Sequence, residues 1–477
     1  MKKDISIHWF RQDLRIDDNP SLNHLSIKGI PVLLIFILDE VNTDRPIGEA
    51  SKIWLNRALI DLNQQVKGKI MFFKGNPIII FRNLLSKFNV KNISWNRCYE
   101  VWRINRDNDL KKFLTDKVDD VKSFNGSLLW EPWEVLKKDK SPYKVFTPYY
   151  QKGCLESKPP RKPITKKIEF FNHNFADYSI ENLKLDPKKK WSLNILKEWE
   201  FSKNSISKVV ENFFEFGIKN YKEGRNFPIK KNVSRLAPYI RWGQVSPHFL
   251  WHKCDQYKKK VSEQNLKTFK SQLGWREFSY YLLFHFPKIT KKNLHSKFDK
   301  FPWISNKKIF NSWSRGLTGY PIVDAGMREL YLTGYMHNRV RMIVGSFLVK
   351  NLLHHWKFGE NWFWNCLFDA DIASNSASWQ WVAGTGADAA PYFRIFNPII
   401  QGKKFDPKGK YTKKYIPELR KLHIKYLFNP WDCPEEILQR NGIKLGKNYP
   451  FPIVDLKLSR EKALSALLTL KEKTKEL

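Results

Sequence analysis

An apolar stretch in the last third of the chain carries two carboxylates and an amide at close spacing. Asp369 and Asp371 stand two residues apart, and Asn375 follows four residues later. Carboxylates among apolar neighbours need partners, and these two could pair with Arg341, bind a metal ion, or accept hydrogen bonds from a ligand. A metal ion is the least favoured partner, because no His or third acid lies at a helpful spacing.

The segment from Gly334 to Trp356 supplies a second set of polar groups. Apolar residues repeat there every three or four positions, which predicts one helix with an apolar face made of Val340, Ile343, Val344, Phe347, Leu348 and Leu352. Another face of the same helix carries Asn338, Arg341, Met342 and Gly345. Buried polar groups need hydrogen-bond partners, so this face indicates either an internal ion pair or a ligand pocket.

The segment 232–238 combines a hydroxyl group, an arginine and the start of a predicted helix. Ser234 and Arg235 lie just ahead of Pro238. Free backbone N–H groups at a helix start suit a phosphate group. The segment therefore fits a phosphate site, but by itself it fits a plain helix cap even better.

Tryptophan is dense between residues 303 and 381. Trp303, Trp356 and Trp379 could carry electrons, but the chain has 19 Trp, and a single Trp is far more typical of core packing. Taken one by one, these three residues predict no redox role.

Two kinds of architecture must position these side chains. Residues 1–130 alternate apolar runs of strand length with amphipathic helices, which predicts a parallel, doubly wound sheet covered on both faces. The expected strands are 5–10, 31–38, 69–73, 92–95 and 121–124, and the expected helices are 50–66 and 77–88. No GxGxxG follows the first strand, which argues against a dehydrogenase-type dinucleotide site.

The pattern changes twice further along the chain. Prolines and lysines between 131 and 200 predict an extended connector. From 201 to 477 strand signals disappear and helical periodicity takes over. We therefore predict an α/β domain at 1–130, a connector at 131–200 and an all-α domain at 201–477.

Composition narrows the classes of function. The 477 residues carry 84 Lys and Arg against 47 Asp and Glu, which favours polyanionic partners, nucleic acid first, although general lysine enrichment would give the same excess. Five scattered cysteines without a CxxC pair argue against a disulfide framework or a cysteine-held metal. No apolar run is long enough to span a membrane, and the first residues do not resemble a signal peptide, so we expect a cytoplasmic monomer without a metal ion.

Short blocks along nearly the whole chain resemble the photolyase/cryptochrome family, and class I cyclobutane pyrimidine dimer (CPD) photolyases most closely. The blocks are residues 8–15 with 18–19, 234–236, 275–278, 319–325, 336–339, 379–381, 388–394 and 397–398. Each block is short, but their joint presence in this order is highly specific. The resemblance implies an α/β antenna domain followed by a helical domain that binds FAD in a bent conformation, in agreement with the predicted architecture.

The resemblance also implies which residues hold FAD. Residues 221 and 233–237 would surround the phosphates, Arg341 would pair with Asp369, and Asn375 would face flavin N5, where a neutral amide favours the reduced flavin. The expected FAD-binding residues are Tyr221, Val233, Ser234, Arg235, Leu236, Ala237, Asn338, Arg341, Asp369, Ala370, Asp371 and Asn375. Val233 and Ala237 replace hydroxyl residues that are common in the family, which leaves backbone N–H groups to hold the phosphates.

Light-driven DNA repair is the activity that the resemblance implies. Excited, fully reduced FAD would donate one electron to a CPD flipped out of UV-damaged DNA, in a pocket poor in water. The expected DNA- and lesion-binding residues are Gln272, Trp275, Arg276, Glu277, Asn338, Met342, Trp381 and Gln401, among which Trp275 and Trp381 form aromatic walls and Gln272 replaces a common Glu. Proteins that repair (6-4) lesions carry His in place of Asn338 and Met342, and a titratable His suits a repair that transfers a proton; the Asn and Met favour CPDs.

Electron supply and light harvesting complete the expectation. Trp379, Trp356 and Trp303 match the family's electron-transfer chain between the flavin and the surface. Residues 99–103 resemble its folate-contacting segment, which makes methenyltetrahydrofolate the expected antenna. Trp102 and Arg103 replace polar and acidic contacts there, so a deazaflavin or no antenna stays open.

Two other hypotheses follow from the same residues. A blue-light signalling cryptochrome would use the same scaffold, but the sequence ends soon after the amphipathic stretch 463–470, without a long tail to recruit partners, and Asn375 replaces the acid or Cys of some cryptochromes. A basic nucleic-acid-binding module without catalysis would explain the charge but not the flavin-like set of residues.

Overall fold

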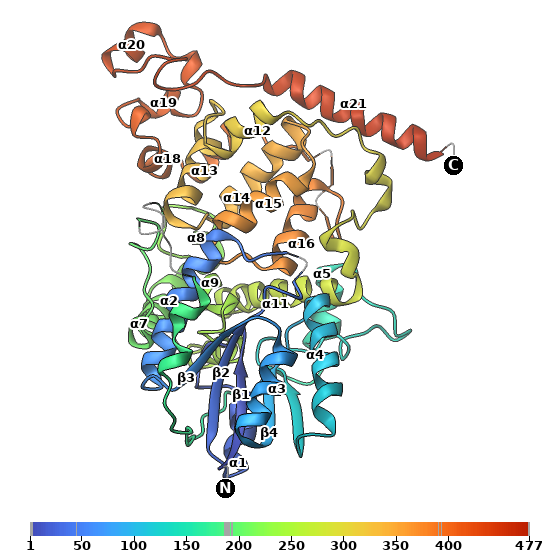
Figure 1. The fold of residues 1–477 in the computed structure, drawn as a ribbon. Helices are drawn as coiled ribbons and strands as arrows, with labels where there is room; N and C mark the ends of the chain where they lie inside the picture. Colours follow the sequence, from blue (N-terminus) through green and yellow to red (C-terminus); the bar gives the residue numbers. More distant parts are fainter. Residues whose placement is uncertain are drawn as a thin grey trace. The chain divides into compact units, whose positions relative to one another are not determined.

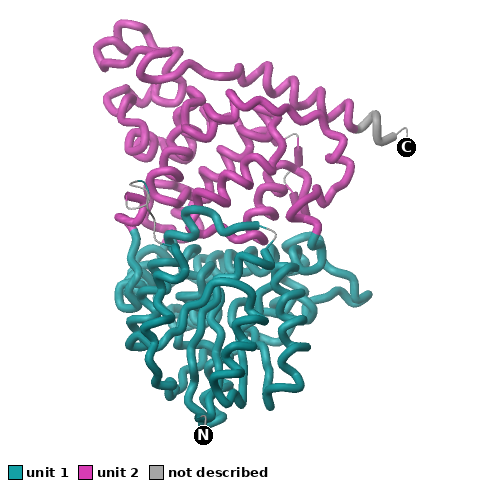
Figure 2. Tube along the Cα trace, in the orientation of Figure 1, with its two compact units in different colours: residues 1–192, 199–219, 234–287 teal, residues 193–198, 220–233, 288–477 magenta. Residues whose placement is uncertain are grey.

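The computed structural model describes residues 3–43, 45–185, 191, 194–389, 391–392 and 394–475. Ala390 and Phe393 of the block 388–394 lie outside the described residues, as do residues 186–190 and 192–193 of the predicted connector. The chain forms two compact units (Figure 2): unit 1 contains residues 1–192, 199–219 and 234–287, and unit 2 contains residues 193–198, 220–233 and 288–477.

A five-stranded parallel sheet forms the centre of unit 1 (Figure 1). Its strands are β1 (Asp4–Phe10), β2 (Val32–Leu38), β3 (Ile70–Lys74), β4 (Asn89–Asn96) and β5 (Asp120–Phe124), in the order β3-β2-β1-β4-β5. Because the chain winds in opposite directions from β1, the sheet is doubly wound. The predicted α/β fold is confirmed, and all five expected strands are present within a few residues of their predicted ends.

Four helices lie between the strands, and an asparagine side chain caps the start of the first and of the third. They are α1 (Pro20–Ile27), α2 (Glu49–Gln65), α3 (Pro77–Lys87) and α4 (Val101–Thr115). Asn76 accepts a hydrogen bond from the backbone N–H of Ile78, and Pro77 occupies the first helical position, where its missing N–H is not needed. Residues 75–77 therefore make the turn from β3 into α3.

The remaining part of unit 1 is helical or extended. Residues 131–185 contain only short helical turns: α5 (Phe146–Pro148), a π-helical turn (Tyr149–Cys154), and 3-10 turns at Ala176–Tyr178 and Ile180–Leu183. Four helices follow in the same unit: α7 (Lys203–Glu215), α9 (Ala237–Arg241), α10 (Pro247–Gln256) and α11 (Glu263–His285). A 3-10 turn (Gly217–Asn220) begins in unit 1 and ends at the first residue of the unit 2 segment 220–233.

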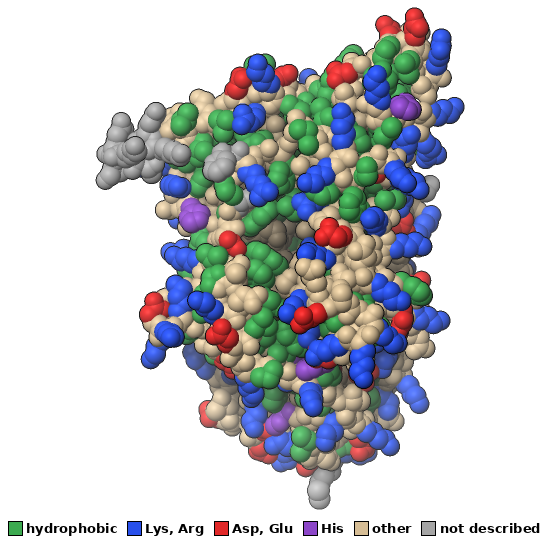
Figure 3. Space-filling view, turned by 180° about the vertical axis from the view of Figure 1, so that it is seen from behind, with side chains coloured by type: hydrophobic (Ala, Val, Ile, Leu, Met, Phe, Trp, Pro, Cys, Tyr) green, Lys and Arg blue, Asp and Glu red, His purple; other side chains and the backbone are tan. Residues whose placement is uncertain are grey.

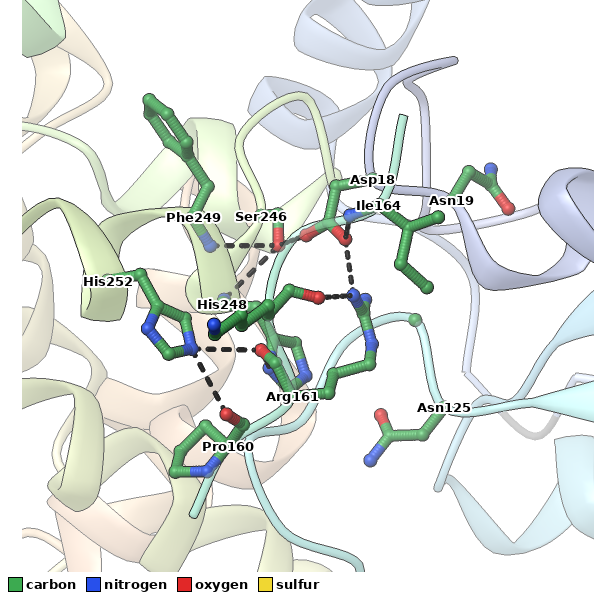
Figure 4. Close-up of polar contacts among 12 residues, drawn as sticks. Asp18, Asn19, Asn125, Pro160, Arg161, Ile164, Ser246, His248, Phe249 and His252 are labelled. Carbon is green, nitrogen blue, oxygen red and sulfur yellow. Dashed lines mark hydrogen bonds and ion pairs between the residues drawn. The ribbon is translucent and has the colours of Figure 1, made fainter. Parts of the chain in front are cut away.

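A buried carboxylate, Asp18, ties three parts of unit 1 together (Figure 4). It lies in the loop after β1 and accepts hydrogen bonds from Ser246 at the start of α10, from Arg161, and from the backbone N–H of Ile164 (3.0 Å). We call Asp18, Arg161 and Ser246 the Asp18 clamp. Asp18 has a left-handed backbone (φ 49°), an uncommon conformation that short polar residues adopt more readily than others.

Unit 2 is built from helices around one large apolar core. Its helices are α8 (Tyr221–Gly224), α12 (Lys307–Ser314), α13 (Pro321–Thr333), α14 (Asn338–Ser346), α15 (Trp356–Cys366), α16 (Ile372–Ala383), α17 (Pro398–Phe405), α18 (Lys410–Tyr415), α19 (Ile424–Leu427), α20 (Glu435–Arg440) and α21 (Leu456–Lys475). Short 3-10 turns lie at Pro287–Thr290, Ser296–Lys300, Pro417–Leu419 and Pro430–Asp432. The predicted all-α fold of the C-terminal part is confirmed.

The single helix predicted from Gly334 to Trp356 is wrong. Gly334 ends α13 in a left-handed conformation, and α14 begins only at residue 338. After α14 the chain makes a π-helical turn (Phe347–Asn351), and Leu353 then adopts a left-handed backbone (φ 52°) that separates it from α15. The apolar repeat continues through this break because both pieces pack on the same core.

No helix in the part of the chain that the structure describes is long and apolar enough to cross a membrane. In the same described residues, no three His, Cys, Asp or Glu side chains are grouped so as to hold a metal ion.

The Asp18 clamp predicts a pH-dependent contribution to stability. Burial raises the pKa of Asp18, but Arg15, Arg161 and Ser246 together outweigh it and hold the pKa below its usual value. A lowered folded-state pKa stabilises the fold above the unfolded-state pKa of about 4, and this stabilisation is lost as the pH falls through the folded-state value. Asp18→Asn should lower the free energy of unfolding by about 3 kcal/mol at pH 7, and the difference should shrink below about pH 4.

Urea unfolding at neutral and acidic pH checks this expectation. Asp17→Asn is the matched control, because Asp17 is exposed and its ion-pair partner Lys203 is exposed as well. Loss of this pair should change the free energy of unfolding by about 0.5 kcal/mol at most. Equal effects of the two substitutions at pH 7 would contradict the clamp.

Candidate functional site

Helices α15 and α16 of unit 2 carry four of the residues that the sequence singled out, namely Trp356, Asn375, Trp379 and Trp381. His355 caps α15 by accepting from the N–H of Lys357 (3.2 Å), and Asp371 caps α16 by accepting from the N–H of Ser374 (2.7 Å). Side-chain caps fix where each helix starts and therefore which residues share its faces. Asp371 is a helix cap as well as a predicted FAD-binding residue.

Arg341 and Asp369 form the ion pair that was predicted. Nη2 of Arg341 lies 2.9 Å and 3.1 Å from the two carboxylate oxygens of Asp369, and its Nε donates to the carbonyl of Met336 at 2.7 Å. The Asp369 side chain is only 9% exposed. The pair joins the start of α14 to the loop before α16, and Ala370 is buried in that loop.

Asn375 is held by a carboxylate that sequence reasoning did not single out. Its Nδ2 donates to the backbone carbonyl (2.9 Å) and to Oε1 (3.0 Å) of Glu360 on α15. Glu360 is fully buried, and Lys357 lies 3.0 Å from its other oxygen. Both N–H groups of the amide are thereby used, and no residue that the structure describes donates to its Oδ1.

Trp379 packs directly on the backbone of α15. A Cβ built on Gly359 would lie 2.0 Å from Cη2 of Trp379, so only glycine leaves room for this ring. Gly359 is three residues after Trp356, which places both on one face of the helix. Trp379 therefore lies over the helix face that carries Trp356, and both side chains are buried.

Trp303 and Trp356 contact the same histidine. The ring centre of His355 lies 5.2 Å from that of Trp303 and 5.3 Å from that of Trp356. Burial lowers the pKa of His355, and Lys357 lowers it further. The three predicted redox tryptophans thus occur in one unit, with Trp356 buried and Trp303 partly exposed.

The other predicted FAD-binding residues fall in both units. Tyr221, which is buried, and Val233 belong to unit 2, whereas the stretch 234–237 belongs to unit 1. In that stretch the N–H of Leu236 donates to Oγ of Ser234 (3.4 Å), and α9 begins at Ala237. Arg235 has a left-handed backbone (φ 52°), a conformation that is uncommon outside glycine and is often found at ligand sites.

The lesion-binding residues predicted in unit 1 also hold the fold. Arg276 donates to the carbonyl of Ser127 (2.8 Å), and Glu277 accepts from the N–H of Leu129 (2.7 Å). Burial raises the pKa of Glu277 to about 7. The ring of Trp275 stacks on Phe146 with centres 3.8 Å apart. Gln272, the fourth member of the set, contacts Ser271 (3.2 Å).

The lesion-binding residues predicted in unit 2 lie at least partly open to solvent. They are Asn338, Met342, Trp381 and Gln401. Arg339, which sequence reasoning missed, lies beside them: it donates to Oδ1 of Asn226 (2.7 Å), and its guanidinium is 4.3 Å from the ring centre of Phe405. Burial lowers the pKa of Arg339, and the nearby Arg225 and Arg394 lower it further. These three cations mark a positive region on unit 2.

The side chains predicted to contact an antenna are already occupied within unit 1. Arg103 forms an ion pair with Glu100, and its guanidinium lies 4.4 Å from the ring centre of Trp102. Arg106 lies 5.1 Å from the same ring. Trp102 and Arg103 therefore stabilise the start of α4, and their contacts give no support to a folate at this position.

The sequence gives little indication that Glu360, Lys357 and Arg339 belong to the candidate site. Glu360 and Lys357 stand in a stretch rich in Trp and Phe, where an acid and a base three residues apart are typical of a solvent-exposed helix face. The block 336–339 contains Arg339 and could have pointed to it. Glu360 could be found only from the packing of α15 against α16.

The geometry of unit 2 fits a bound flavin. A buried amide whose two donors are engaged, and whose oxygen accepts from no residue that the structure describes, suits a ligand N–H such as that of a reduced flavin. Asp369 and Arg341 add a polar pair near the starts of α16 and α14. When bound, FAD would supply the chromophore and the one-electron donor. The fold and this set define a protein with a doubly wound α/β part and a helical part suited to hold a flavin.

The chain belongs to the photolyase/cryptochrome family. Residues 6–166 match the family model described as DNA photolyase, and residues 269–469 match the model described as FAD binding domain of DNA photolyase. A deoxyribodipyrimidine photo-lyase from Agrobacterium fabrum is 41% identical over 98% of both chains, and Cryptochrome-2 from Arabidopsis thaliana is 34% identical over 98% of this chain and 79% of its own. The predicted family is confirmed.

A solved structure extends this likeness to the whole fold. A bacterial class III photolyase from Agrobacterium tumefaciens is 41% identical, with a TM-score of 0.94 over 99% of this chain and 98% of its own. Because that structure is titled class III, the comparison lends no support to the predicted closeness to class I. The class of this chain stays a prediction.

The close approach of Trp379 to α15 yields a second prediction. Gly359→Ala should push the indole ring away and lower the free energy of unfolding by about 2 kcal/mol, as overpacking of a buried contact does. Gly345→Ala is the matched control, because a Cβ on this helical glycine of α14 would come no nearer than 3.2 Å, to a methyl group of Val382, and would meet the Trp379 ring only at an ordinary contact distance of 3.6 Å. Denaturant unfolding measures both, and a stability loss no greater for Gly359→Ala than for Gly345→Ala would show that the ring has room to move.

Proposed function

We propose that this chain repairs cyclobutane pyrimidine dimers in DNA by light-driven electron transfer from reduced FAD. The curated relatives that support this include enzymes named deoxyribodipyrimidine photo-lyase at 41% and 35% identity. We assign FAD binding to the residues that the sequence predicts to hold FAD, and lesion binding to the residues that it predicts to contact DNA.

The orientation of Asn375 is the observation that carries the proposal. Glu360 engages both N–H groups of the amide, so the group that Asn375 offers to a ligand is an acceptor. An acceptor favours a protonated flavin N5 and hence the reduced state, which is the state able to donate an electron. An acid held at this place could present a proton donor instead and would weaken that preference.

The three tryptophans supply a route for reducing the flavin. We assign Trp379, Trp356 and Trp303 to electron transfer, with Trp379 nearest the flavin and Trp303 nearest solvent. Their rings lie on or beside α15, and Trp303 is the partly exposed member. A buried path that ends at an exposed ring lets the flavin draw electrons from outside while its pocket stays dry.

Damaged DNA is the partner that the surface charge favours. Lys and Arg side chains are spread over the face shown in Figure 3, with fewer acidic side chains among them. Such a surface binds the phosphate backbone without sequence preference. We assign Arg339, with Arg225 and Arg394, to phosphate contacts beside the lesion.

The lesion type rests on two residues of α14. Asn338 and Met342 lie together, with Nδ2 of the amide 3.9 Å from the sulfur. Neither side chain can donate a proton as His does, which favours CPDs over (6-4) lesions.

FAD is the only chromophore that we assign to this chain. The contacts of Trp102 and Arg103 do not support the predicted methenyltetrahydrofolate antenna.

Blue-light signalling is the second candidate function. The 34% identity to a plant cryptochrome over 98% of this chain favours this function specifically.

One experiment distinguishes repair from signalling. Purified protein with bound flavin should reverse CPDs in damaged oligonucleotides under illumination, and loss of the dimer is measured by chromatography. Flavin photoreduction without dimer reversal would support signalling and contradict repair.

The electron route predicts a separation of two activities. Trp379→Phe should slow photoreduction of the oxidised flavin by at least about tenfold, because each 1.36 kcal/mol added to a barrier is a factor of ten. Dimer reversal should be nearly unchanged when the flavin has been reduced chemically beforehand. Trp313→Phe, at a fully buried tryptophan beside Trp379, is the control and should leave photoreduction intact. Loss of repair in chemically reduced Trp379→Phe would refute the assigned role.

The positive region on unit 2 predicts a salt-dependent loss of DNA affinity. Arg339→Gln should weaken binding to damaged and undamaged duplex alike and reduce the slope of log K against log salt by about 1, the loss of one phosphate contact. Fluorescence anisotropy at several salt concentrations measures this slope. Arg420→Gln is the control: it removes one exposed charge elsewhere on unit 2 and should leave the slope nearly unchanged. If both variants changed the slope equally, the effect would come from the total charge of the protein and the contact assigned to Arg339 would be wrong.

A further inference from the structure

Trp356, the middle tryptophan of the proposed electron route, is held by a relay of two side chains. Its Nε1 donates to Oδ1 of Asn293 at 2.8 Å, and Nδ2 of Asn293 donates to Oδ1 of Asp299 at 2.6 Å. Trp356 and Asn293 are buried, whereas Asp299 is exposed on a 3-10 turn (Ser296–Lys300). A neutral amide thus stands between the indole N–H and a carboxylate.

The charges around Trp356 make this contact important for an electron hole. Nζ of Lys357 lies 5.1 Å from the Trp356 ring centre, and the ring of His355 lies 5.3 Å away. A positive charge formed on the indole is destabilised by the lysine. It is stabilised by the amide oxygen of Asn293, whose dipole Asp299 strengthens, because hydrogen bonds in a chain polarise one another.

We propose that Asn293 and Asp299 are positioning residues that keep the indole proton on Trp356 while an electron hole passes through it. This inference rests on the proposed function, because it assigns a role within the tryptophan route. An oxidised indole is a much stronger acid than a neutral one, but an amide oxygen is too weak a base to take its proton. The amide therefore stabilises the charged ring without neutralising it.

Each step of the route moves one electron and, up to the last, no proton. One electron leaves Trp379 for the photoexcited oxidised flavin, one moves from Trp356 to Trp379, and one moves from Trp303 to Trp356. The proton is released only at Trp303, which is partly exposed to water and whose Nε1 makes a long hydrogen bond (3.3 Å) to a carbonyl. An external reductant such as a thiol then restores Trp303 with one electron and one proton.

A base at position 293 would interrupt this sequence. A carboxylate in hydrogen-bond contact with the indole would take the proton and leave a neutral radical on Trp356. The hole would then stop at Trp356, because oxidising Trp303 from that radical needs the proton to return. The amide of Asn293 contacts the indole, and the acid Asp299 lies one step further out. This order allows the electron hole to move on from Trp356.

The first test observes the relay without light. In holoprotein labelled with ¹⁵N-Trp, the indole resonance of Trp356 is assigned by its loss in Trp356→Phe. Asp299→Asn should shift this resonance upfield, because it weakens the hydrogen bond at the indole, whereas Asp116→Asn, at an exposed acid in unit 1, should not move it. An unchanged Trp356 resonance in Asp299→Asn overturns the relay.

The second test swaps the two relay side chains, which preserves composition and charge. In a Trp303→Phe background, where Trp356 ends the route, flash excitation should give a protonated indole radical. The added pair Asn293→Asp/Asp299→Asn should convert it to the neutral radical, identified by its blue-shifted absorption. The radical should live at least about tenfold longer, because charge recombination then needs the proton to return from the carboxylate together with the electron, which raises the barrier by about 1.4 kcal/mol.

The outcomes separate this inference from the function on which it rests. A radical that stays protonated in the swapped variant overturns the inference and leaves the tryptophan route standing. Absence of any tryptophan radical in the parent protein overturns the route, and the role proposed here falls with it. Flavin content and circular dichroism of each variant establish that it is folded, and Asn293→Leu, which removes the relay without adding a base, should give no neutral radical.

Discussion

The contact between α15 and α16 is the constraint on which the functional part of unit 2 depends. At one point Gly359 leaves room for the ring of Trp379, and one turn away on α16 the amide of Asn375 reaches Glu360. The first contact sets the distance between the helices and the second sets their rotation, so the two together aim an acceptor oxygen and an aromatic ring from the same helix. The ring of Trp379 could not take this position if α15 carried a larger residue than Gly359.

Much of the architecture was predictable because it follows from the placement of apolar residues. Strand β2 is an uninterrupted apolar run and β1 and β3 are nearly so, and such runs between helices leave little choice but a covered parallel sheet. The break between α14 and α15 was not predictable, because the apolar repeat continues across it while the backbone passes through a π-helical turn and a left-handed Leu353. The periodicity of apolar residues indicates which side chains face the core. It does not detect a change in backbone conformation that leaves the same side chains facing the core.

The site was predictable only as far as local chemistry reaches. The pairing of Arg341 with Asp369 followed from a family resemblance and is present. Glu360 and Asn293 were missed because each acts through a partner distant in sequence: Asn293 meets Trp356 from 63 positions away. No sequence pattern within one helix predicts such a contact. An amide or an acid near aromatic residues gives the same sequence pattern whether its side chain is buried or faces water. Only the packed structure shows which polar groups are enclosed.

Lys357 belongs to two networks at once. It neutralises the buried carboxylate of Glu360, and it stands over the ring of Trp356. The same cation therefore sets how firmly the amide of Asn375 is aimed and how readily the neighbouring indole gives up an electron. Replacing Lys357 would therefore change both properties together, and neither could be adjusted at this position without the other.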